Sequence, residues 1–338
     1  MNGPALRIDL ALQGGGAHGA FTWGVLDRLL EEPWLHIDGI SGTSAGAMNA
    51  VVLAHGHLED GANGARAALE RFWHEVSWAA RFSPFQRGPL DRLLGRWTLD
   101  YSPFFVAMDM MARVVSPYDA NPLGANPLRS ILASTVDFAR LSQSAMKLFV
   151  TATNVRTGRG RVFRNGEITP DVLLASACLP TLFQAIVIDG EPYWDGGYLG
   201  NPTITPLVRE CDSQDTILVQ INPVERPGVL RSAREILDRL NEVSFNAVLL
   251  KELRMIALLR KVARPAGEGA RWANMRIHRI ASDVMLDLGY SSKLNAEWAF
   301  LTMLRDRGRQ AAEGFLAAHR NDLGRQSSLD LDVLLEGI

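Results

Sequence analysis

The chain has 338 residues, of which 47% are hydrophobic and 21% are charged. This length and composition are typical of a globular protein with a substantial core, and they exclude wholesale disorder. A formal net charge of −2 excludes a generally basic nucleic-acid-binding surface, and two cysteines are too few for a disulfide framework. The N-terminal stretch is unlike a secretory signal, and no run of about 18 apolar residues occurs. We therefore expect a cytoplasmic protein.

The first half of the chain alternates between predicted strands and helices. An apolar run over residues 6–13 ends at three glycines, which predicts a buried strand followed by a tight turn. Apolar residues recur at helical spacing over 18–30, a short strand follows at 37–41, and small residues favour a helix over 45–53. Strands that alternate with helices pair in parallel, so we predict an α/β fold.

Residues 72–105 interrupt this pattern, because they hold nine aromatic residues together with several prolines and glycines. We expect this segment to be an insertion that caps the edge of the sheet, forming either a second small core or an acyl-chain pocket. The alternation then resumes, with predicted strands at 148–155, 185–189, 216–221 and 275–281 and predicted helices at 171–178, 230–262 and 293–319.

The sequence Gly42-Thr43-Ser44-Ala45-Gly46 lies between a predicted strand and a predicted helix. This is the nucleophile-elbow pattern, in which a serine occupies a sharp turn and the small residues Gly42 and Gly46 let the strand and helix approach closely. The helix that begins there offers free backbone amides to a developing anion. The alternative is an ordinary glycine-rich loop.

A second motif, Gly14-Gly15-Gly16-Ala17-His18-Gly19, also follows a strand and precedes a helix. Consecutive glycines allow backbone amides to converge on an oxyanion or a phosphate. The same glycines match the dinucleotide-binding pattern G-x-G-x-x-G, with Asp38 placed 19 residues after Gly19 as a ribose-binding acid. A nicotinamide-dependent oxidoreductase is therefore a rival interpretation of this motif alone.

The third motif is Asp195-Gly196-Gly197, at the end of an apolar stretch. Two glycines leave the aspartate side chain accessible, although Asp-Gly is also a common turn signal. In order and spacing, the three motifs together resemble the patatin-like phospholipases over about residues 6–222. The run 175–180 and the pair Asn201-Pro202 are also similar to that family. The dinucleotide interpretation accounts only for the first motif.

The resemblance implies a serine–aspartate dyad, with Ser44 as the nucleophile and Asp195 as its general base. It further implies that the amides of Gly15 and Gly16, helped by those of Gly14 and Ala45, bind the oxyanion. Serine is a poor nucleophile until a base takes its proton, and a carboxylate with the usual pKa of about 3.9 is a weak base. We therefore expect Asp195 to be partly desolvated, because burial raises the basicity of a carboxylate.

One departure from the family pattern concerns His18, which stands where the family usually has arginine or lysine. A neutral imidazole supplies only part of such a charge at neutral pH, which leaves the head-group preference open. Among the other histidines, His278 lies in a predicted strand and is the one candidate base for a serine–histidine triad; a strand-face role is the alternative. No histidine cluster has metal-ligand spacing, so we expect no metal.

The segment 230–264 combines an apolar stripe with many basic residues. This pattern is typical of a helix on an anionic lipid surface, and equally of an amphipathic helix that packs on a sheet. The apolar faces of the C-terminal helices are accordingly either a homodimer interface or core. Contact with a membrane or lipid surface stays an expectation at this point.

We predict a three-layer α/β/α sandwich with a mainly parallel sheet, comprising a catalytic domain over 6–222 and a mainly helical extension over 223–338. The predicted reaction is hydrolysis of lipid carboxylic esters (phospholipase A, lysophospholipase or esterase type) through an acyl-serine, with no cofactor. The alternatives are hydrolysis of short acyl esters, polyester oligomers or thioesters, and, in other classes, the oxidoreductase or a non-catalytic lipid-binding module. Nucleic acid is not an expected partner.

Overall fold

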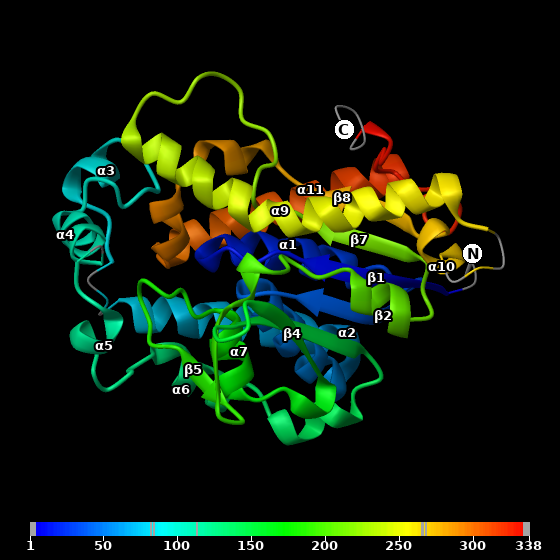
Figure 1. The fold of residues 1–338 in the computed structure, drawn as a ribbon, viewed down its shortest axis with the longest axis horizontal. Helices are drawn as coiled ribbons and strands as arrows, with labels where there is room; N and C mark the ends of the chain where they lie inside the picture. The colour runs from blue at the N-terminus through cyan, green and yellow to red at the C-terminus, as the bar shows by residue number, and fades with distance from the viewer. Residues whose placement is uncertain are drawn as a thin grey trace.

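A computed structural model describes residues 5–81, 83, 85–112, 114–264, 267 and 269–333. Its centre is a single sheet with strand order β5-β6-β3-β2-β1-β7-β8, in which β4 pairs with β3 off this path (Figure 1). The strands are β1 (Leu6–Leu12), β2 (Leu35–Gly42), β3 (Lys147–Asn154), β4 (Arg159–Arg164), β5 (Ile186–Ile188), β6 (Glu191–Asp195), β7 (Asp215–Val219) and β8 (Arg276–Ile280).

The middle of the sheet is parallel, as the alternation of strands and helices predicts. β1 pairs in parallel with β2 and β7, β2 with β3, and β7 with β8, whereas β4, β5 and β6 form the antiparallel edge. Parallel strands are covered by helices on both faces, which explains why β1 and β7 are almost continuously buried. The carboxyl ends of β1 and β2 consequently lie at one edge of the sheet, where the predicted glycine loop and serine turn follow them.

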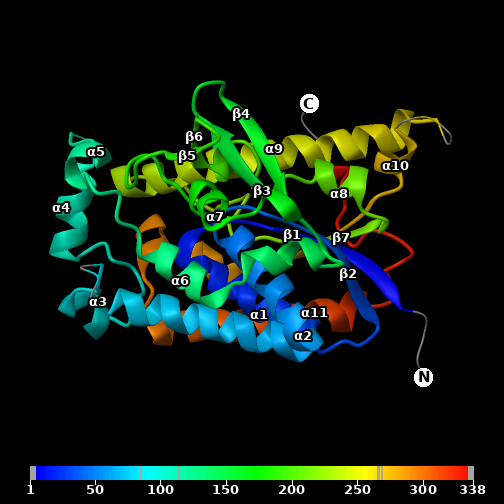
Figure 2. The same ribbon diagram turned by 90° about the horizontal axis from the view of Figure 1, so that it is seen from below.

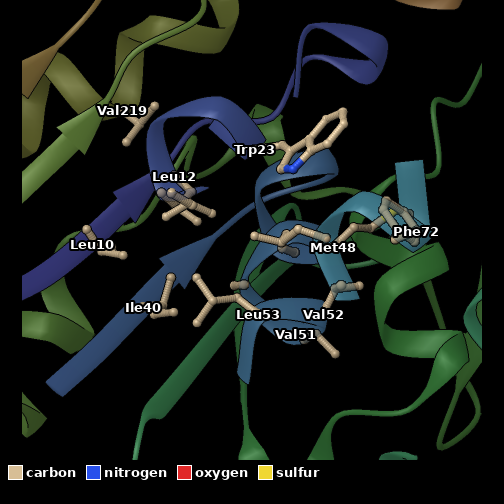
Figure 3. Packing of buried hydrophobic residues seen from close by; sticks show 14 of the residues in the cluster. Leu10, Leu12, Trp23, Ile40, Met48, Val51, Val52, Leu53, Phe72 and Val219 are labelled. Carbon is tan, nitrogen blue, oxygen red and sulfur yellow. The ribbon is translucent and has the colours of Figure 1, made fainter. Parts of the chain in front are cut away.

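Helices cover both faces of the sheet and make a three-layer sandwich. Figure 2 shows α1 (Gly19–Leu29), α2 (Ala45–Ala80) and α11 (Trp298–His319) on one side, with α9 (Ala233–Val262) on the other. Strand side chains alternate between two cores: Leu10 and Leu12 face the first layer, and Ala11 faces α9 and α8 (Thr205–Glu210). Figure 3 shows the first core, where Leu10, Leu12 and Ile40 from the strands pack near Met48 and Leu53 from α2.

The segment after the serine turn differs from the prediction. The helix expected over 45–53 continues to Ala80, with non-helical backbone at Asp60 and Gly61, and the first residues of the expected cap, Phe72 and Trp73, are buried in it. The broken structure that follows comprises α3 (Pro89–Leu93), α4 (Pro103–Met111) and α5 (Pro117–Ala120), which gather at one end of the molecule (Figures 1 and 2). Phe82 and Pro84 of the expected cap lie outside the described residues.

The residues after 222 complete the sandwich and are not a separate appendage. They contribute β8 to the sheet, together with α9, α10 (Ala270–Ala273) and α11. α11 crosses α1 closely, because a Cβ added to Gly24 would lie 1.9 Å from the Arg305 oxygen, and one added to Gly308 would lie 2.0 Å from the Phe21 oxygen. The predicted helix over 293–319 begins as a helix only at Trp298. Residues 334–338 lie outside the described part.

Further helices connect these layers: α6 (Pro127–Thr135), α7 (Pro170–Ser176) and the short turns η1 (Gly16–His18), η2 (Phe138–Gln143), η3 (Asn165–Glu167), η4 (Gly196–Tyr198), η5 (Asp283–Asp287) and η6 (Tyr290–Leu294). In the described residues, no helix combines the length and apolarity that crossing a bilayer requires.

Candidate active site

Ser44 occupies a strained turn between β2 and α2. Its backbone lies in the left-handed region with φ 53° and ψ −123°, and its side chain is largely buried. Glycine flanks this turn for steric reasons, since a Cβ added to Gly46 would lie 2.2 Å from the Leu12 oxygen, and one added to Gly42 would lie 2.6 Å from the Gly46 carbonyl carbon. A non-glycine residue held in this backbone conformation costs energy, and such strain concentrates at functional sites.

Asp195 reaches the serine turn through the pairing of the antiparallel edge. It ends β6, where it pairs with Ala152 of β3, and β3 in turn lies beside the β2 strand that leads to Ser44. Ser44 and Asp195 line the same cavity, and the Ser44 hydroxyl is one of the groups that lower the pKa of the Asp195 carboxyl. Asp195 also caps η4, because its Oδ1 atom accepts a hydrogen bond of 2.7 Å from the Gly197 amide.

The surroundings of Asp195 adjust its basicity. Burial raises the pKa of its carboxyl group to about 7, while the Gly197 amide, the Ser44 hydroxyl and the Lys293 ammonium act in the opposite direction. A general base works best when its pKa is close to the operating pH. The carboxylate of Asp195 is therefore desolvated, and its pKa lies near neutrality.

The glycine loop after β1 faces the serine turn. The Gly14 amide is occupied, since it donates a hydrogen bond of 2.6 Å to Asn201 Oδ1, and the Gly14 oxygen accepts one of 2.9 Å from Asn222 Nδ2. Among the described residues, no acceptor is bonded to the amides of Gly15, Gly16 and Ala45. These three amides therefore stay candidates for binding an oxyanion. The Gly14 amide does not, because its hydrogen bond to Asn201 anchors the loop.

His18 is a buried neutral side chain in this structure. Its Nε2 atom lies 2.8 Å from Ser292 Oγ, and Ser292 donates its own proton to the Gly289 oxygen, so His18 is the donor in the pair. Burial, together with the cations Lys293 and Arg226, holds the pKa of His18 well below its usual value. His18 therefore carries no charge near the glycine loop at neutral pH. Gly19, the next motif residue, begins α1.

A cavity of about 240 Å³ connects these groups. It is walled mainly by apolar side chains, with Ser44 and Asp195 among its lining residues. A second cavity of about 680 Å³, between α4 and the start of α9, shares four of its lining residues: Leu179, Leu182, Tyr290 and Leu294. The two cavities are therefore neighbours, and the larger one lies toward the end of the molecule that carries α4. Sequence reasoning missed the contribution of η6, including Lys293, because no motif marks it.

The dinucleotide-binding interpretation needs Asp38 beside the glycine loop, and a serine–histidine triad needs His278 beside Ser44. The structure shows neither arrangement in the residues that it describes. Asp38 lies in the first half of β2, away from the glycine loop, and accepts hydrogen bonds from the amides of Asp212 and Ser213. His278 contacts Asp215 Oδ1 and Ser328 Oγ, each at 3.1 Å. The dinucleotide arrangement is therefore absent in the described residues, and His278 is a strand residue that anchors the C-terminal tail.

One group of described residues places three ligand-type atoms within 4.8 Å of one another: Asp9, Asp38 and Cys211. Burial raises the pKa of Asp9 to about 8 and raises that of the Cys211 thiol. Lys147 Nζ lies 3.6 Å from Asp38 Oδ1. Asp9 is therefore mostly protonated at neutral pH in the metal-free protein, and Asp9 and Asp38 lie near the middle of β1 and β2, away from the serine turn.

Fold and site together define a class of protein: an α/β sandwich of lipid ester hydrolase type, with a serine turn and a glycine loop at the carboxyl ends of adjacent parallel strands. A family model described as patatin-like phospholipase matches residues 10–208. The chain belongs to this family, and with it to the enzymes that hydrolyse lipid esters.

Two solved structures are similar to this chain at low identity. VipD from Legionella pneumophila is 16% identical with a TM-score of 0.41, over 94% of this chain and 67% of that one. The type III effector protein ExoU is also 16% identical, with a TM-score of 0.27, over 98% of this chain. This chain spans only 62% of the ExoU chain. No curated protein sequence matches.

Proposed function

We propose that this protein is a serine acyl hydrolase in which Ser44 and Asp195 form a catalytic dyad that cleaves carboxylic esters of lipids. The observation that carries the proposal is Ser44 on a left-handed turn, in the wall of an apolar cavity that it shares with the buried carboxylate of Asp195. Burial of that carboxylate raises its pKa to about 7, which gives it the basicity that the reaction needs.

The proposed reaction has two halves. Asp195 takes the Ser44 hydroxyl proton as Oγ bonds to the ester carbonyl carbon, and the amides of Gly15, Gly16 and Ala45 hold the resulting oxyanion. The bond to the alcohol then breaks, and Asp195 returns the proton to the leaving alkoxide. Water attacks the acyl-Ser44 in the same way, with its proton passing to Asp195 and then to Ser44 Oγ as the fatty acid leaves.

The substrate class follows from the walls of the cavity. The side chains around Ser44 include Met48, Phe72, Leu179 and Phe183, which match an acyl chain and offer few polar partners to a small hydrophilic ester. Phospholipase A, lysophospholipase and esterase activities all share this acyl chemistry. Short acyl esters, polyester oligomers and thioesters are the alternative substrates for the same dyad.

The end of the molecule formed by α3, α4, α5 and the start of α9 would contact the lipid surface, and a substrate would enter the protein there. We define this apolar end by its most exposed side chains, Leu93, Val114 and Leu123, at 82%, 86% and 92% exposure. The larger cavity is lined by residues of α4 and of the start of α9, and it shares lining residues with the cavity that holds Ser44. In contrast, Leu249 and Leu253 of α9 are buried on the sheet, which matches the alternative of an amphipathic helix packed as core.

The test is hydrolysis of p-nitrophenyl esters from acetate to palmitate by the wild type, Ser44→Ala and Asp195→Asn, together with fluorophosphonate labelling. We expect labelling and turnover in the wild type, loss of both in Ser44→Ala, and turnover falling by orders of magnitude in Asp195→Asn. A long-chain optimum supports lipid substrates, and a short-chain optimum supports small esters. Full activity of Asp195→Asn would contradict the dyad, and no turnover by the wild type would favour a lipid-binding module.

A further inference from the structure

Lys293 lines the catalytic cavity, although it lies outside the residues that the family model matches. This half-buried lysine belongs to η6 and lines the cavity together with Gly15, Gly16, Ser44 and Asp195. Its main-chain oxygen also packs against the glycine loop, since a Cβ added to Gly16 would lie 2.4 Å from it. Lys293 is therefore fixed beside the loop that carries the proposed oxyanion donors.

The ammonium has a neutral hydrogen-bond partner in place of an ion pair. Lys293 Nζ donates a hydrogen bond of 2.8 Å to Asn222 Oδ1, and it lies 5.8 Å from the ring centre of Phe245. Over the described ranges, no carboxylate oxygen lies within 4.0 Å of Nζ. Glu242, which acts on Lys293 at longer range, is engaged by Arg226 at 2.7 Å.

A desolvated cation without a contact ion pair is costly unless an anion forms beside it. Burial lowers the pKa of Lys293 to about 8, and the nearby cation Arg226 lowers it further. The carboxylates of Glu242, Asp238 and Asp195 act in the opposite direction. The amine is therefore still mostly charged at pH 7. The interaction of two charges strengthens as the local dielectric constant falls. In this cavity, negative charge develops on the ester oxygen when Ser44 attacks, and a bound phosphate group is the other anion to consider.

The position of the amine favours the ester oxygen. Asn222 joins Lys293 Nζ directly to the glycine loop, because the amide that accepts from Nζ also donates to the Gly14 oxygen. Lys293, Gly15 and Gly16 line the same cavity as Ser44, and Lys293 is near enough to Asp195 to act on its carboxylate. His18, the motif residue at the position where a cation is expected, is neutral and turned toward Ser292.

We propose that the Lys293 ammonium stabilises the oxyanion formed when Ser44 attacks the substrate, so that the C-terminal part of the chain supplies the positive charge of the catalytic site. This inference rests on the proposed Ser44–Asp195 reaction. It makes Lys293 a catalytic residue, acting together with the amides of the glycine loop.

The experiment uses Lys293→Gln, Lys293→Met and Lys293→Arg, assayed on p-nitrophenyl butyrate, a neutral ester without a head group. Gln keeps a hydrogen-bond donor without the charge, Met removes both, and Arg keeps the charge. We expect Gln and Met to lower kcat by about 10²- to 10³-fold, the size of effect known for one oxyanion donor, with KM nearly unchanged. Arg is expected to retain activity within about tenfold of the wild type.

Lys251→Met is the matched control, because Lys251 is an exposed lysine on α9 away from the cavity. We expect it to leave kcat unchanged, and circular dichroism melts confirm that each variant is folded. A second readout is pH dependence: loss of the ammonium removes a cation near Asp195, so the acidic limb of the kcat profile moves to higher pH in Gln and Met. Lys293→Arg, which keeps the charge, should leave this limb in place, so the shift separates loss of the charge from a change in packing.

Wild-type turnover of the neutral ester by Lys293→Gln and Lys293→Met would overturn the proposal. Loss confined to a phospholipid substrate, with the neutral ester unaffected, would also overturn it and assign the amine to the head-group phosphate instead. Failure of the underlying dyad is distinguishable, because Ser44→Ala would then retain activity whatever the Lys293 variants do.

Discussion

Asn201 Oδ1 accepts a hydrogen bond of 2.6 Å from the Gly14 amide, which joins the segment after the aspartate motif to the glycine loop after β1. This bond fixes the first residue of the loop, so that the next two amides remain free to face Ser44. Asn201 is fully buried, and an unpaired buried amide would be left behind if its side chain were removed.

We therefore expect Asn201→Ala to lower kcat on p-nitrophenyl esters by about tenfold or more and to cost roughly 1–3 kcal/mol of unfolding free energy. The matched control is Asn165→Ala. Asn165 similarly accepts from the Leu148 amide at 2.8 Å and donates to the Met146 oxygen, but in η3 at a distance from the site. It should lose stability and keep its kcat, and equal losses of kcat in both variants would contradict the role given to Asn201.

The pH profile of kcat/KM should be bell-shaped around neutrality. The acidic limb reflects ionisation of Asp195, whose pKa burial raises to about 7, since the protonated acid cannot accept the Ser44 proton. The basic limb reflects loss of the Lys293 charge, with a pKa lowered to about 8. Initial rates of hydrolysis of a neutral ester, measured at pH values on both sides of neutrality, define both limbs. An acidic limb centred near pH 4 would show that Asp195 is not desolvated in the working enzyme.

Charging the apolar end should separate lipid binding from chemistry. The triple variant Leu93→Asp, Val114→Asp and Leu123→Asp places carboxylates where three exposed apolar side chains stand. We expect it to lose most of its co-sedimentation with phospholipid vesicles and its activity on them, while turnover of soluble p-nitrophenyl butyrate stays within about twofold, because the changes are far from Ser44.

The control for that variant is Val187→Asp, in β5, where a valine is 63% exposed outside the apolar end. It should bind vesicles as the wild type does. Unchanged vesicle binding by the triple variant would show that another surface contacts lipid.

Asp9 should make the protein less stable as the pH rises. Burial beside Asp38 raises the pKa of the Asp9 carboxyl from 3.8 to about 8, so the folded state holds a proton that the unfolded chain releases. The resulting loss of unfolding free energy is absent below about pH 4 and grows up to about pH 8. We expect Asp9→Asn to stabilise the protein in urea unfolding, and to do so by more at pH 8 than at pH 5. An equal gain at both pH values would contradict this account.

Asp215 should have the opposite effect to Asp9 on how stability changes with pH. Its contacts with His278 and Arg276 oppose the effect of burial and lower its pKa to about 2. An acid with a lowered pKa stabilises the folded state above its unfolded pKa, and this contribution is lost as the pH falls toward 2. Asp215→Asn should therefore destabilise the protein at pH 7, by less at pH 3.

The strand-associated motifs could be predicted from the sequence because they are local. Glycines after an apolar run reflect the steric needs of the turn at Gly16. A serine between small residues reflects those of the turn at Ser44. The parallel sheet followed from alternating periodicity, and the family comparison and the structure confirm the α/β sandwich with its helical C-terminal part.

The remaining features depend on contacts between distant segments, which periodicity does not contain. Lys293 and Asn222 reach the glycine loop from separate connections, and neither belongs to a motif. Leu249 and Leu253 have the spacing of an interfacial helix as well as that of a core helix, and only the position of α9 on the sheet decides between the two.

The crossing of α1 and α11 bears on how the protein is made. Helix α1 directly follows the glycine loop, yet the groove that Gly24 and Gly308 create is filled only by the last long helix of the chain. While the ribosome is still synthesising the C-terminal third, the sheet lacks β8 and one face is uncovered. A chain that stops at residue 222 should therefore expose a large apolar surface, and catalytic competence should require the segment that carries α9, β8 and α11.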